Sequence, residues 1–489
     1  MSEFFHGVRT IKKSSSPNQP VVATSGITFA VGTAPVHITD NPSVDEPVLI
    51  QSFPESERLL GFADDWQKYD LCEIVYSHFK LYNTSPVVFV NVLDPKVHKK
   101  TVAPKAYPIT NGRAVLPFEA VKSTVKAESY VKGEDFELFY NDGQLIFEVI
   151  EGGGIASTVT EVSVGFDEVD PSMVTAEDII GGLDLETKKR KGLELINAVF
   201  PKYRILPDIC LCPKWSGKPE VAAVMAAKME GYNGIFNGKA LIDVDTNAVK
   251  FYQDVPAWKA ENGINSKTQV LCFPLVRRDG RTFRMSTHMA GLMATVDASN
   301  SGIPSESPSN KPLIIDSVVV LDESDAEGAA EILLDIQEAN YLNENGITTA
   351  VNFANGFVLW GNYTAIYPNS DNPNNPDEYF LYASRMFDWV GNTVILTHWA
   401  RVDGKLNQRI IESIVDVLNI WFNGLVREEH LLGGRAEFPP ELNSAESFSK
   451  GKISFNLIMS PQGIAQEILH ILSYDSSYIT GLLAGLGGV

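Results

Sequence analysis

The chain has 489 residues, and its 40 lysines and arginines against 61 aspartates and glutamates give a formal net charge of −21. Its 44% hydrophobic and 21% charged residues are typical of a globular protein and exclude a wholly disordered chain. The acidic balance argues against nucleic acid as the main partner, because that binding needs Lys and Arg to neutralise phosphates. No apolar run reaches the roughly 18 residues of a membrane span, and the first residues lack the pattern of a secretory signal.

The first 25 residues show no regular pattern. Phe5, Val8 and Ile11 are scattered through them, and the run Ser14-Ser15-Ser16-Pro17 continues neither a helix nor a central strand. This arm is therefore either disordered or borrowed by a neighbouring molecule. The elements predicted after it are a strand over 27–32, a helix around 66–82 and a buried strand over 87–92.

Between about 96 and 180 the pattern changes to short strands. Phe136–Tyr140 and Leu145–Ile150 flank Asn141-Asp142-Gly143, which is a strong hairpin signal, and Val159–Gly165 alternates as a further strand. We expect a small β-module inserted outside the main core.

From residue 185 strands alternate with helices, which favours a largely parallel sheet covered on both faces. The predicted strands are 209–212, 240–244, 270–273 and 314–321, and the predicted helices are 219–230, 249–261, 285–296 and 326–342. A hairpin follows over 349–360, with Asn355-Gly356 as its turn.

The last region begins after a polar loop at 369–377. A long helix is predicted over 408–430, and a strand over 452–459 has Ile453, Phe455 and Leu457 on one face. The tail is apolar up to Val489, which predicts a docked end.

Candidate catalytic and metal-binding residues are few. The four cysteines have no metal-ligand spacing and predict no disulfide framework. Asp243 and Asp245 follow a strand, where a metal or general-base role is conceivable, but an N-cap before the 249–261 helix is the favoured interpretation. His288 lies in a predicted helix without an HExxH pattern and is interpreted as a satisfied or solvated histidine.

A phosphate-binding loop and a basic run also need an interpretation. Residues 234–239 resemble a phosphate loop, but Asn233 replaces its first glycine and Ala240 its magnesium-binding hydroxyl, so nucleotide binding is rejected. The basic run 188–191 is interpreted as a solvated face at a helix start. We therefore predict no catalytic residue, no cofactor-binding residue and no metal site.

Several short segments together resemble one known family. In chain order they are Phe5-His6-Gly7-Val8, Gly32-Thr33-Ala34-Pro35, Met289–Ala294 with Asp297, Leu342–Ile347 with Leu359-Trp360-Gly361, Arg385-Met386-Phe387 and Leu432-Gly433-Gly434. Their order and spacing resemble the tail sheath proteins of contractile-tailed bacteriophages and phage-tail-like particles, over nearly the whole chain. Asn362-Tyr363-Thr364 follows Gly361 where that family commonly has Arg-Thr after W-G-x, so contacts of that arginine are not expected here.

The resemblance implies an α/β multidomain protein with a subtilisin-like α/β middle domain without protease function, an inserted β-sandwich, and an α+β C-terminal domain with extended arms at both ends. The expected divisions are an N-terminal arm (1–25), the first part of the core (26–95), the β-sandwich (96–180), the α/β domain (181–366), a tube-facing C-terminal domain (367–465) and a C-terminal arm (466–489).

The implied function is structural. The subunit would polymerise as a helical cylinder of stacked, hexameric rings around the tail tube and contract by rigid-body rearrangement, driving the tube through the bacterial envelope for DNA ejection. The implied partners are other copies of the chain, the tail tube protein, and baseplate and tail terminator proteins, without direct nucleic acid contact or membrane insertion. The implied location is the tail of a virion, or of a phage-tail-like bacteriocin, made in the bacterial host cytoplasm. The alternative is a soluble α/β metabolic enzyme, a hydrolase or phosphotransferase, with a β accessory domain.

Two sets of site residues follow from this interpretation. Residues expected to exchange strands between subunits are Phe5, Val8, Ile11, Ile453, Phe455, Leu457, Ile468 and Ile471. Lys405 and Arg409, at the start of the 408–430 helix, are expected to face carboxylates of the tail tube; a purely solvated role is an equally open interpretation.

Overall fold

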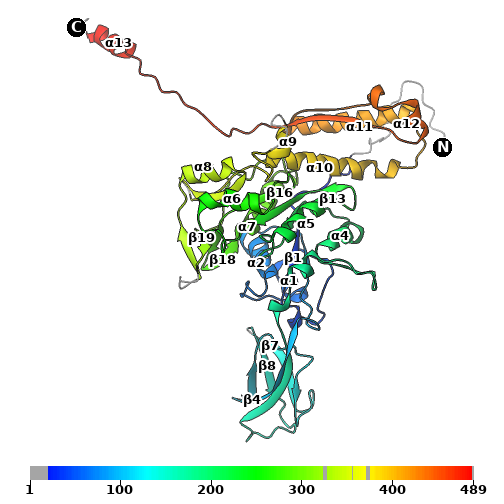
Figure 1. Cartoon of the computed structure of the whole chain (residues 1–489), viewed down its shortest axis with the longest axis vertical. Helices are drawn as coiled ribbons and strands as arrows, with labels where there is room; N and C mark the ends of the chain where they lie inside the picture. Colours follow the sequence, from blue (N-terminus) through cyan, green and yellow to red (C-terminus); the bar gives the residue numbers. More distant parts are fainter. Residues whose placement is uncertain (1–19, 142, 323–327, 355, 370–374, 487–489) are drawn as a thin grey trace, which may run out of the picture.

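An eight-stranded sheet forms the centre of the chain, and the computed structural model describes residues 20–141, 143–322, 328–354, 356–369 and 375–486 (Figure 1). In sheet order the strands are β2 (Val48–Ile50), β3 (Val87–Asn91), β1 (Thr28–Gly32), β12 (Ile209–Leu211), β15 (Lys239–Asp243), β16 (Gln269–Cys272), β21 (Ile347–Asn352) and β22 (Phe357–Trp360). The inner six are parallel and the two edge strands are antiparallel to their neighbours. The inner strands are apolar runs because helices cover both faces of the sheet, as predicted.

The covering helices fall into two groups. They are α2 (Leu71–Tyr76) with α7 (Met285–Ser299), and α3 (Ala176–Ile180) with α4 (Ile196–Tyr203) and α5 (Pro219–Met229). Almost every residue of α7 is buried, because it lies between the sheet and the turn after α2. Gly291 of α7 packs against the Tyr82 ring, where a Cβ atom would lie 2.5 Å from Cδ2, so the close approach requires glycine.

Residues 99–169 form two three-stranded sheets at one end of the molecule (Figure 1). Their strands are β4 (Lys99–Pro108), β9 (Glu161–Val169) and β6 (Lys126–Ala127), and β5 (Arg113–Leu116), β8 (Gln144–Val149) and β7 (Phe136–Asn141). The predicted hairpin is confirmed as β7–β8. These sheets enclose their own hydrophobic cluster, in which the Phe136 and Phe147 rings stack with centroids 4.1 Å apart.

A smaller sheet and a helix lie on one flank of the core. The sheet has the order β18-β17-β19-β20, with β17 (Leu275–Arg278), β18 (Arg281–Arg284), β19 (Ser317–Leu321) and β20 (Ala329–Ile332), and the helix is α8 (Ile336–Glu344). The prediction of one helix over 326–342 is therefore wrong for its first half. Residues 329–332 gain backbone partners by pairing with β19, and Asp335 starts the helix by accepting hydrogen bonds from the amides of Gln337 and Glu338.

The 249–261 prediction also needs correction, because α6 spans only Val255–Glu261. Pro256 lies in its first turn, where the missing N–H costs nothing, and does not interrupt a longer helix. Asp245 consequently caps no helix; its carboxylate accepts a hydrogen bond from the amide of Asn247 within a turn.

The C-terminal region lies at the end of the molecule opposite the 99–169 sheets (Figure 1). Its elements are α9 (Pro376–Tyr379), α10 (Leu381–His398), α11 (Gln408–Arg427), β23 (Leu431–Glu437), α12 (Ala445–Ser449), β24 (Asn456–Pro461) and α13 (Ser477–Leu486). The long helix is confirmed as α11, whereas α10 was not predicted, and Gly433 and Gly434 lie inside β23. None of the helices in the described part of the chain has the length and apolarity to cross a membrane.

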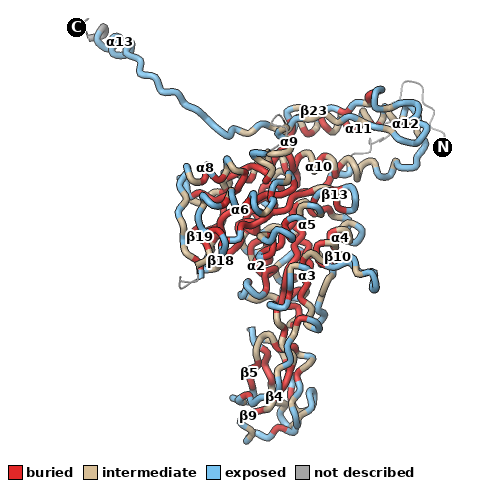
Figure 2. The backbone as a smooth tube through the Cα atoms, viewed as in Figure 1, coloured by how far each residue is buried: buried red, intermediate tan, exposed pale blue. Residues whose placement is uncertain are grey.

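The chain beyond β24 leaves the body, and residues 465–483 are exposed (Figure 2). Leu472 is 95% exposed and Tyr478 is 80% exposed. The prediction of a docked apolar end is wrong for the described part of the tail, because its apolar side chains from Ile468 to Leu483 are exposed.

The separate cluster of residues 99–169 predicts a separable unfolding step. Phe147→Ala removes a fully buried ring and is expected to destabilise these sheets by about 3–5 kcal/mol. Calorimetry should show an early transition for the 99–169 sheets and an unchanged main transition. Val115→Ala, at an exposed position of the same sheets, is the control; a uniform shift of both transitions by Phe147→Ala would contradict the expectation.

Candidate functional site

The first described residues run along α10 and are bonded to it at three points. The amides of Val21 and Ala23 donate to the hydroxyls of Thr397 (3.0 Å) and Thr393 (3.2 Å). The Trp389 indole N–H donates to the Ala23 carbonyl oxygen at 2.7 Å. These side chains recur at a spacing of four residues, so they share one face of the helix. The start of the described chain is therefore tied to the C-terminal region.

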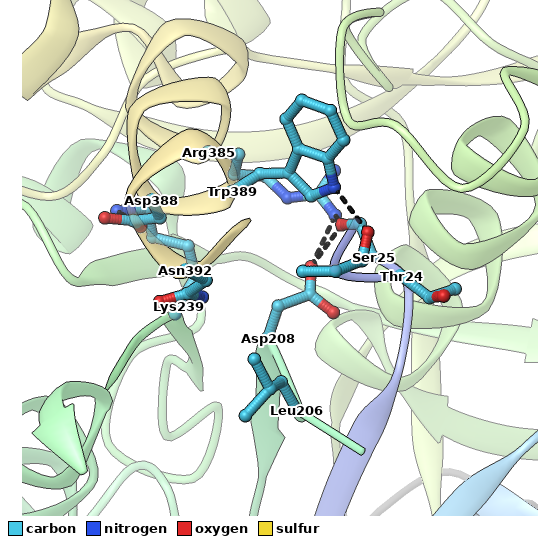
Figure 3. Close-up of a pocket in the computed structure, with 11 residues that line it drawn as sticks. Thr24, Ser25, Leu206, Asp208, Lys239, Arg385, Asp388, Trp389 and Asn392 are labelled. Carbon is cyan, nitrogen blue, oxygen red and sulfur yellow. Dashed lines mark hydrogen bonds and ion pairs between the residues drawn. The ribbon is translucent and has the colours of Figure 1, made fainter. Parts of the chain in front are cut away.

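An ion-pair cluster lies at the end of this segment (Figure 3). The Arg385 guanidinium of α10 donates to Asp297 of α7 (Nη1–Oδ1, 3.1 Å) and to Asp208 just before β12 (Nη2–Oδ2, 2.9 Å). The Ser25 Oγ lies within hydrogen-bond distance of the same two carboxylates, 2.6 Å from Asp208 and 2.9 Å from Asp297, and they share its single proton. Asp208 also accepts from the Ile27 amide at 2.8 Å, immediately before β1. One arginine thus joins the N-terminal segment, the sheet, α7 and α10; we call these four side chains the arm anchor.

Burial sets the electrostatics of the arm anchor. The side chains of Arg385 and Asp297 are 2% and 0% exposed. Burial raises the pKa of Asp297, and the adjacent Arg385 opposes that shift. Burial alone would lower the pKa of Arg385, but Asp297 and Asp208 hold it above its ordinary value. The arginine therefore stays charged, and it compensates the carboxylates that it contacts.

A second buried ion pair lies beside the arm anchor. Lys239, the first residue of β15, places Nζ 2.7 Å from the Asp388 carboxylate of α10. Burial raises the pKa of Asp388, whereas Lys239 lowers it. Asn392 and Asn237 exchange two hydrogen bonds a turn further along α10. The free space among these residues is only about 10 Å³, roughly the volume needed for one water. The arrangement fastens elements together and does not accommodate a ligand.

The hairpin of β23 and β24 lies on α11. Gly434 packs against the Phe422 ring, where a Cβ atom would lie 2.8 Å from Cδ1, which explains the glycine at this position. The Asn419 amide bonds both backbone groups of Ala436, accepting from its N–H at 2.8 Å and donating to its carbonyl at 3.1 Å. Asn419 thereby occupies part of the outer edge of β23. The other edge of the hairpin belongs to β24, which pairs only with β23 among the described residues.

The predicted strand-exchange residues fall on this hairpin and on the tail. Phe455 and Leu457 pack partly buried against the core, as the alternation predicted, although β24 begins at Asn456 and not at 452. Ile468 and Ile471 are 71% and 81% exposed in the segment after β24. Ile453 lies just before the strand. Phe5, Val8 and Ile11 lie outside the described residues.

The tail is held where it leaves the body. The Gln466 side-chain amide donates to the Tyr363 hydroxyl. The Tyr363 ring stacks on Tyr367 with centroids 4.0 Å apart and on Phe380 at 5.3 Å. Tyr363 belongs to the segment that departs from the family's Arg-Thr pattern. In this chain an aromatic stack at that place holds the base of the tail.

The proposed tube-facing residues are separate from these contacts. Lys405 lies in the loop before α11 and Arg409 in its first turn, and both are exposed. Neither forms an ion pair with a described residue, so both are available to a partner.

The residues considered for chemistry have structural roles. Asp243 is buried and accepts hydrogen bonds from the Ser286 amide (2.9 Å), the Ser286 hydroxyl (2.5 Å) and the Ser216 hydroxyl (3.1 Å). His288 is buried with Nδ1 3.1 Å from the Tyr82 hydroxyl, and burial lowers its pKa to about 3. Lys239, the lysine of the rejected phosphate loop, is buried in its pair with Asp388. Across the described ranges no three His, Cys, Asp or Glu side chains gather as a metal site would require, and all four cysteines are buried and free.

The sequence and the fold of the chain are similar to those of known proteins. The chain is 26% identical to the tail sheath protein of Burkholderia phage BcepMu over 502 aligned residues, covering 99% of each protein. It superimposes on the helical sheath of the anti-feeding prophage in its contracted state with a TM-score of 0.55, at 14% identity, covering 96% of this chain and 99% of that one. The sheath complex of an extracellular contractile injection system, PVC, in its contracted state aligns with a TM-score of 0.54 at 11% identity, covering 98% and 100%. No protein-family model matches the chain.

The mixed α/β multidomain fold is therefore that of the sheath subunits of contractile injection systems. Together with the near full-length sequence match, this identifies the chain as a tail sheath protein of a contractile phage tail or phage-tail-like particle. As such it is a structural protein and not a metabolic hydrolase or phosphotransferase.

The arm anchor predicts a large effect of one substitution. Arg385→Met leaves the buried Asp297 and the partly buried Asp208 without their cation and should lower the free energy of unfolding by about 3–5 kcal/mol. Arg427→Met is the matched control, because the Arg427 side chain is 82% exposed and its ion pair with Glu428, at 3.6 Å, is also exposed. This substitution should lower the free energy of unfolding by less than about 1 kcal/mol. Similar denaturant midpoints for both variants would show that the anchor contributes little.

Proposed function

We propose that this sheath subunit polymerises by strand exchange around the open edge of β24. Residues 4–20 and 466–480 of neighbouring copies would add to the β23–β24 sheet. The single observation on which the proposal rests is the combination of an unpaired strand edge with a long exposed apolar tail in one chain. A backbone edge and apolar side chains both gain partners when a neighbour's extended segment pairs there.

The available backbone groups follow from the register. Ala436 directs its N–H and carbonyl to Asn419 and therefore away from β24. Its cross-strand partner Leu457 then directs its own groups away from β23, and Met459, two residues further, does the same. An added strand would bond to the backbone of Leu457 and Met459. Of the tail, only the part before Ser477 is extended, because 477–486 is helical.

The finer organisation of the chain belongs to the same proposal. We divide it into an arm over 1–25, a core of 26–95 and 181–366, a β-sandwich over 96–180, a tube-facing domain over 367–465 and a second arm over 466–489. The separate hydrophobic cluster between Tyr107 and Phe166 supports the β-sandwich as a domain. The sheet order β2-β3-β1-β12-β15-β16-β21 supports a subtilisin-like topology for the core.

Contraction would be a rigid-body rearrangement of copies linked by these arms. The arm anchor supports this, because it fixes the root of the N-terminal arm to the sheet and to α10. The assembled sheath would enclose the tail tube, end at baseplate and terminator proteins, and drive the tube through the bacterial envelope.

Removal of residues 1–19 tests the exchange. The hydrogen bonds of the N-terminal segment to α10 begin at Val21 and the arm anchor begins at Ser25, so the shortened chain should fold with an unchanged melting temperature and remain monomeric. Negative-stain electron microscopy should show long cylinders for the full chain and none for the shortened one. Normal cylinders from the shortened chain would rule out the exchange.

Charge reversal tests the tube contact. Lys405→Glu with Arg409→Glu should abolish co-sedimentation with tail tubes, because two cations facing carboxylates become anions. Lys126→Glu with Lys132→Glu changes the net charge equally on exposed residues of the distant 99–169 region and should leave co-sedimentation intact. Unchanged tube binding by the first variant would place the tube contact elsewhere.

A further inference from the structure

A basic hairpin projects from one flank of the core (Figure 1). Its strands are β10 (Gly182–Leu183) and β11 (Arg190–Lys191), so the basic run 188–191 lies in a hairpin, and its last residue, Lys191, is also the N-cap of the 3-10 helix Gly192–Leu195. Arg190 lies 3.7 Å from Glu194, whereas neither Lys188 nor Lys189 forms an ion pair with a described residue. Leu185, at the tip, is 74% exposed. In a chain of net charge −21, this is an unusual concentration of positive charge beside an apolar side chain.

Close backbone packing fixes the base of the hairpin. Gly181 and Gly192 cross at its base with φ of 62° and 54°, and Cβ atoms there would lie 2.0 Å from the Lys191 carbonyl oxygen and 2.4 Å from that of Ile179. Only glycine permits this crossing. At the tip the Asp184 carboxylate accepts from the amides of Glu186 and Thr187 and closes the turn. The shape of the hairpin is therefore set by the chain itself.

The opposite flank carries the complementary surface. Residues 328–345, which form β20 and α8, contain four acidic residues and no Lys or Arg. Asp335 and Glu338 are engaged in capping α8, whereas Glu331 and Glu344 are exposed. Leu333 between the two elements is 81% exposed. β20 is an edge strand that pairs only with β19 among the described residues.

We propose that the β10–β11 hairpin of one copy binds the β20–α8 flank of the next copy, with Lys188 and Lys189 facing Glu331 and Glu344 and Leu185 meeting Leu333. The two surfaces lie on opposite sides of the same molecule (Figure 1). Such a contact is head-to-tail and repeats from copy to copy, as a ring or helical row requires. This contact rests on the proposed polymerisation and adds an interface that uses neither arm.

The charges determine which surfaces meet more than how strongly they bind. Exposed ion pairs contribute little each, but complementary charge speeds encounter and fixes register. The two leucines lose exposed apolar area in the contact, which supplies the non-directional part of the attraction. A second copy is also a favourable partner on grounds of charge. Each copy carries a net charge of −21, so the positively charged hairpin is attracted to it.

Cysteine cross-linking tests the contact in the full chain. Leu185→Cys with Leu333→Cys in one chain should yield, under mild oxidation of assembled cylinders, a ladder of disulfide-linked dimers, trimers and longer species on a non-reducing gel. The four native cysteines are buried and should not react. Each single-cysteine variant, and the pair Leu185→Cys with Val131→Cys on the exposed surface of the 99–169 sheets, should give no ladder.

The outcomes separate this contact from the proposed function. Cylinders without a ladder would overturn the hairpin contact and leave strand exchange standing. A full chain that never forms cylinders would overturn both. A ladder that stops at dimers would also overturn the contact as proposed, because a head-to-tail interface continues.

Charge exchange gives an independent readout. Lys188→Glu with Lys189→Glu should raise the protein concentration needed for assembly about tenfold or more. Glu331→Lys with Glu344→Lys should do the same, and all four substitutions in one chain should restore assembly. Lys126→Glu with Lys132→Glu, with the same change in net charge, should have no effect. If the variant with all four substitutions does not regain assembly while both double variants stay folded, the pairing is overturned.

Discussion

The buried guanidinium of Arg385 is the interaction on which the rest of the arrangement depends. It compensates two carboxylates that come from different parts of the chain and would be costly to bury alone. Through Ser25 it also determines where the N-terminal segment enters the body. The sheet, the α7 layer and the C-terminal helices are consequently joined to one another and to the N-terminal segment through this one cluster. The proposed rearrangement of whole subunits relies on such internal links.

The elements predicted correctly are those in which apolar side chains mark every buried position. β1 and β3 are apolar runs because they lie inside a covered sheet, and α11 shows a clear stripe because one face meets the hairpin while the other is exposed. α10 was missed because one of its faces is buried through polar side chains such as Arg385 and Thr393, so apolar periodicity does not mark it. β20 was assigned to a helix because its alanines favour helices, whereas its neighbour β19 offers backbone partners.

The candidate site was only partly predictable. Resemblance to a family pointed separately to Asp297 and Arg385, but nothing in the sequence shows that residues 88 positions apart form an ion pair. Ser25 and Asp208 had no signal at all, because a serine in a polar segment and an aspartate before a strand are common. The alternation of Phe455 and Leu457 was a reliable signal, since it reports which face of a strand is covered. The segment proposed to pair with that strand would come from another copy, so the pattern of one chain carries no signal for it.

The segment between β24 and α13 also limits the geometry of any assembly. Fifteen residues, 462–476, separate Pro461 from Ser477. A chain spans at most about 3.3–3.6 Å per residue, so this segment reaches roughly 50 Å. If α13 stays bound to a neighbour, that length is a ceiling on how far the two bodies can separate during a rearrangement. A tail bound in this way would limit how far two subunits can move apart and would set no limit on how closely they approach.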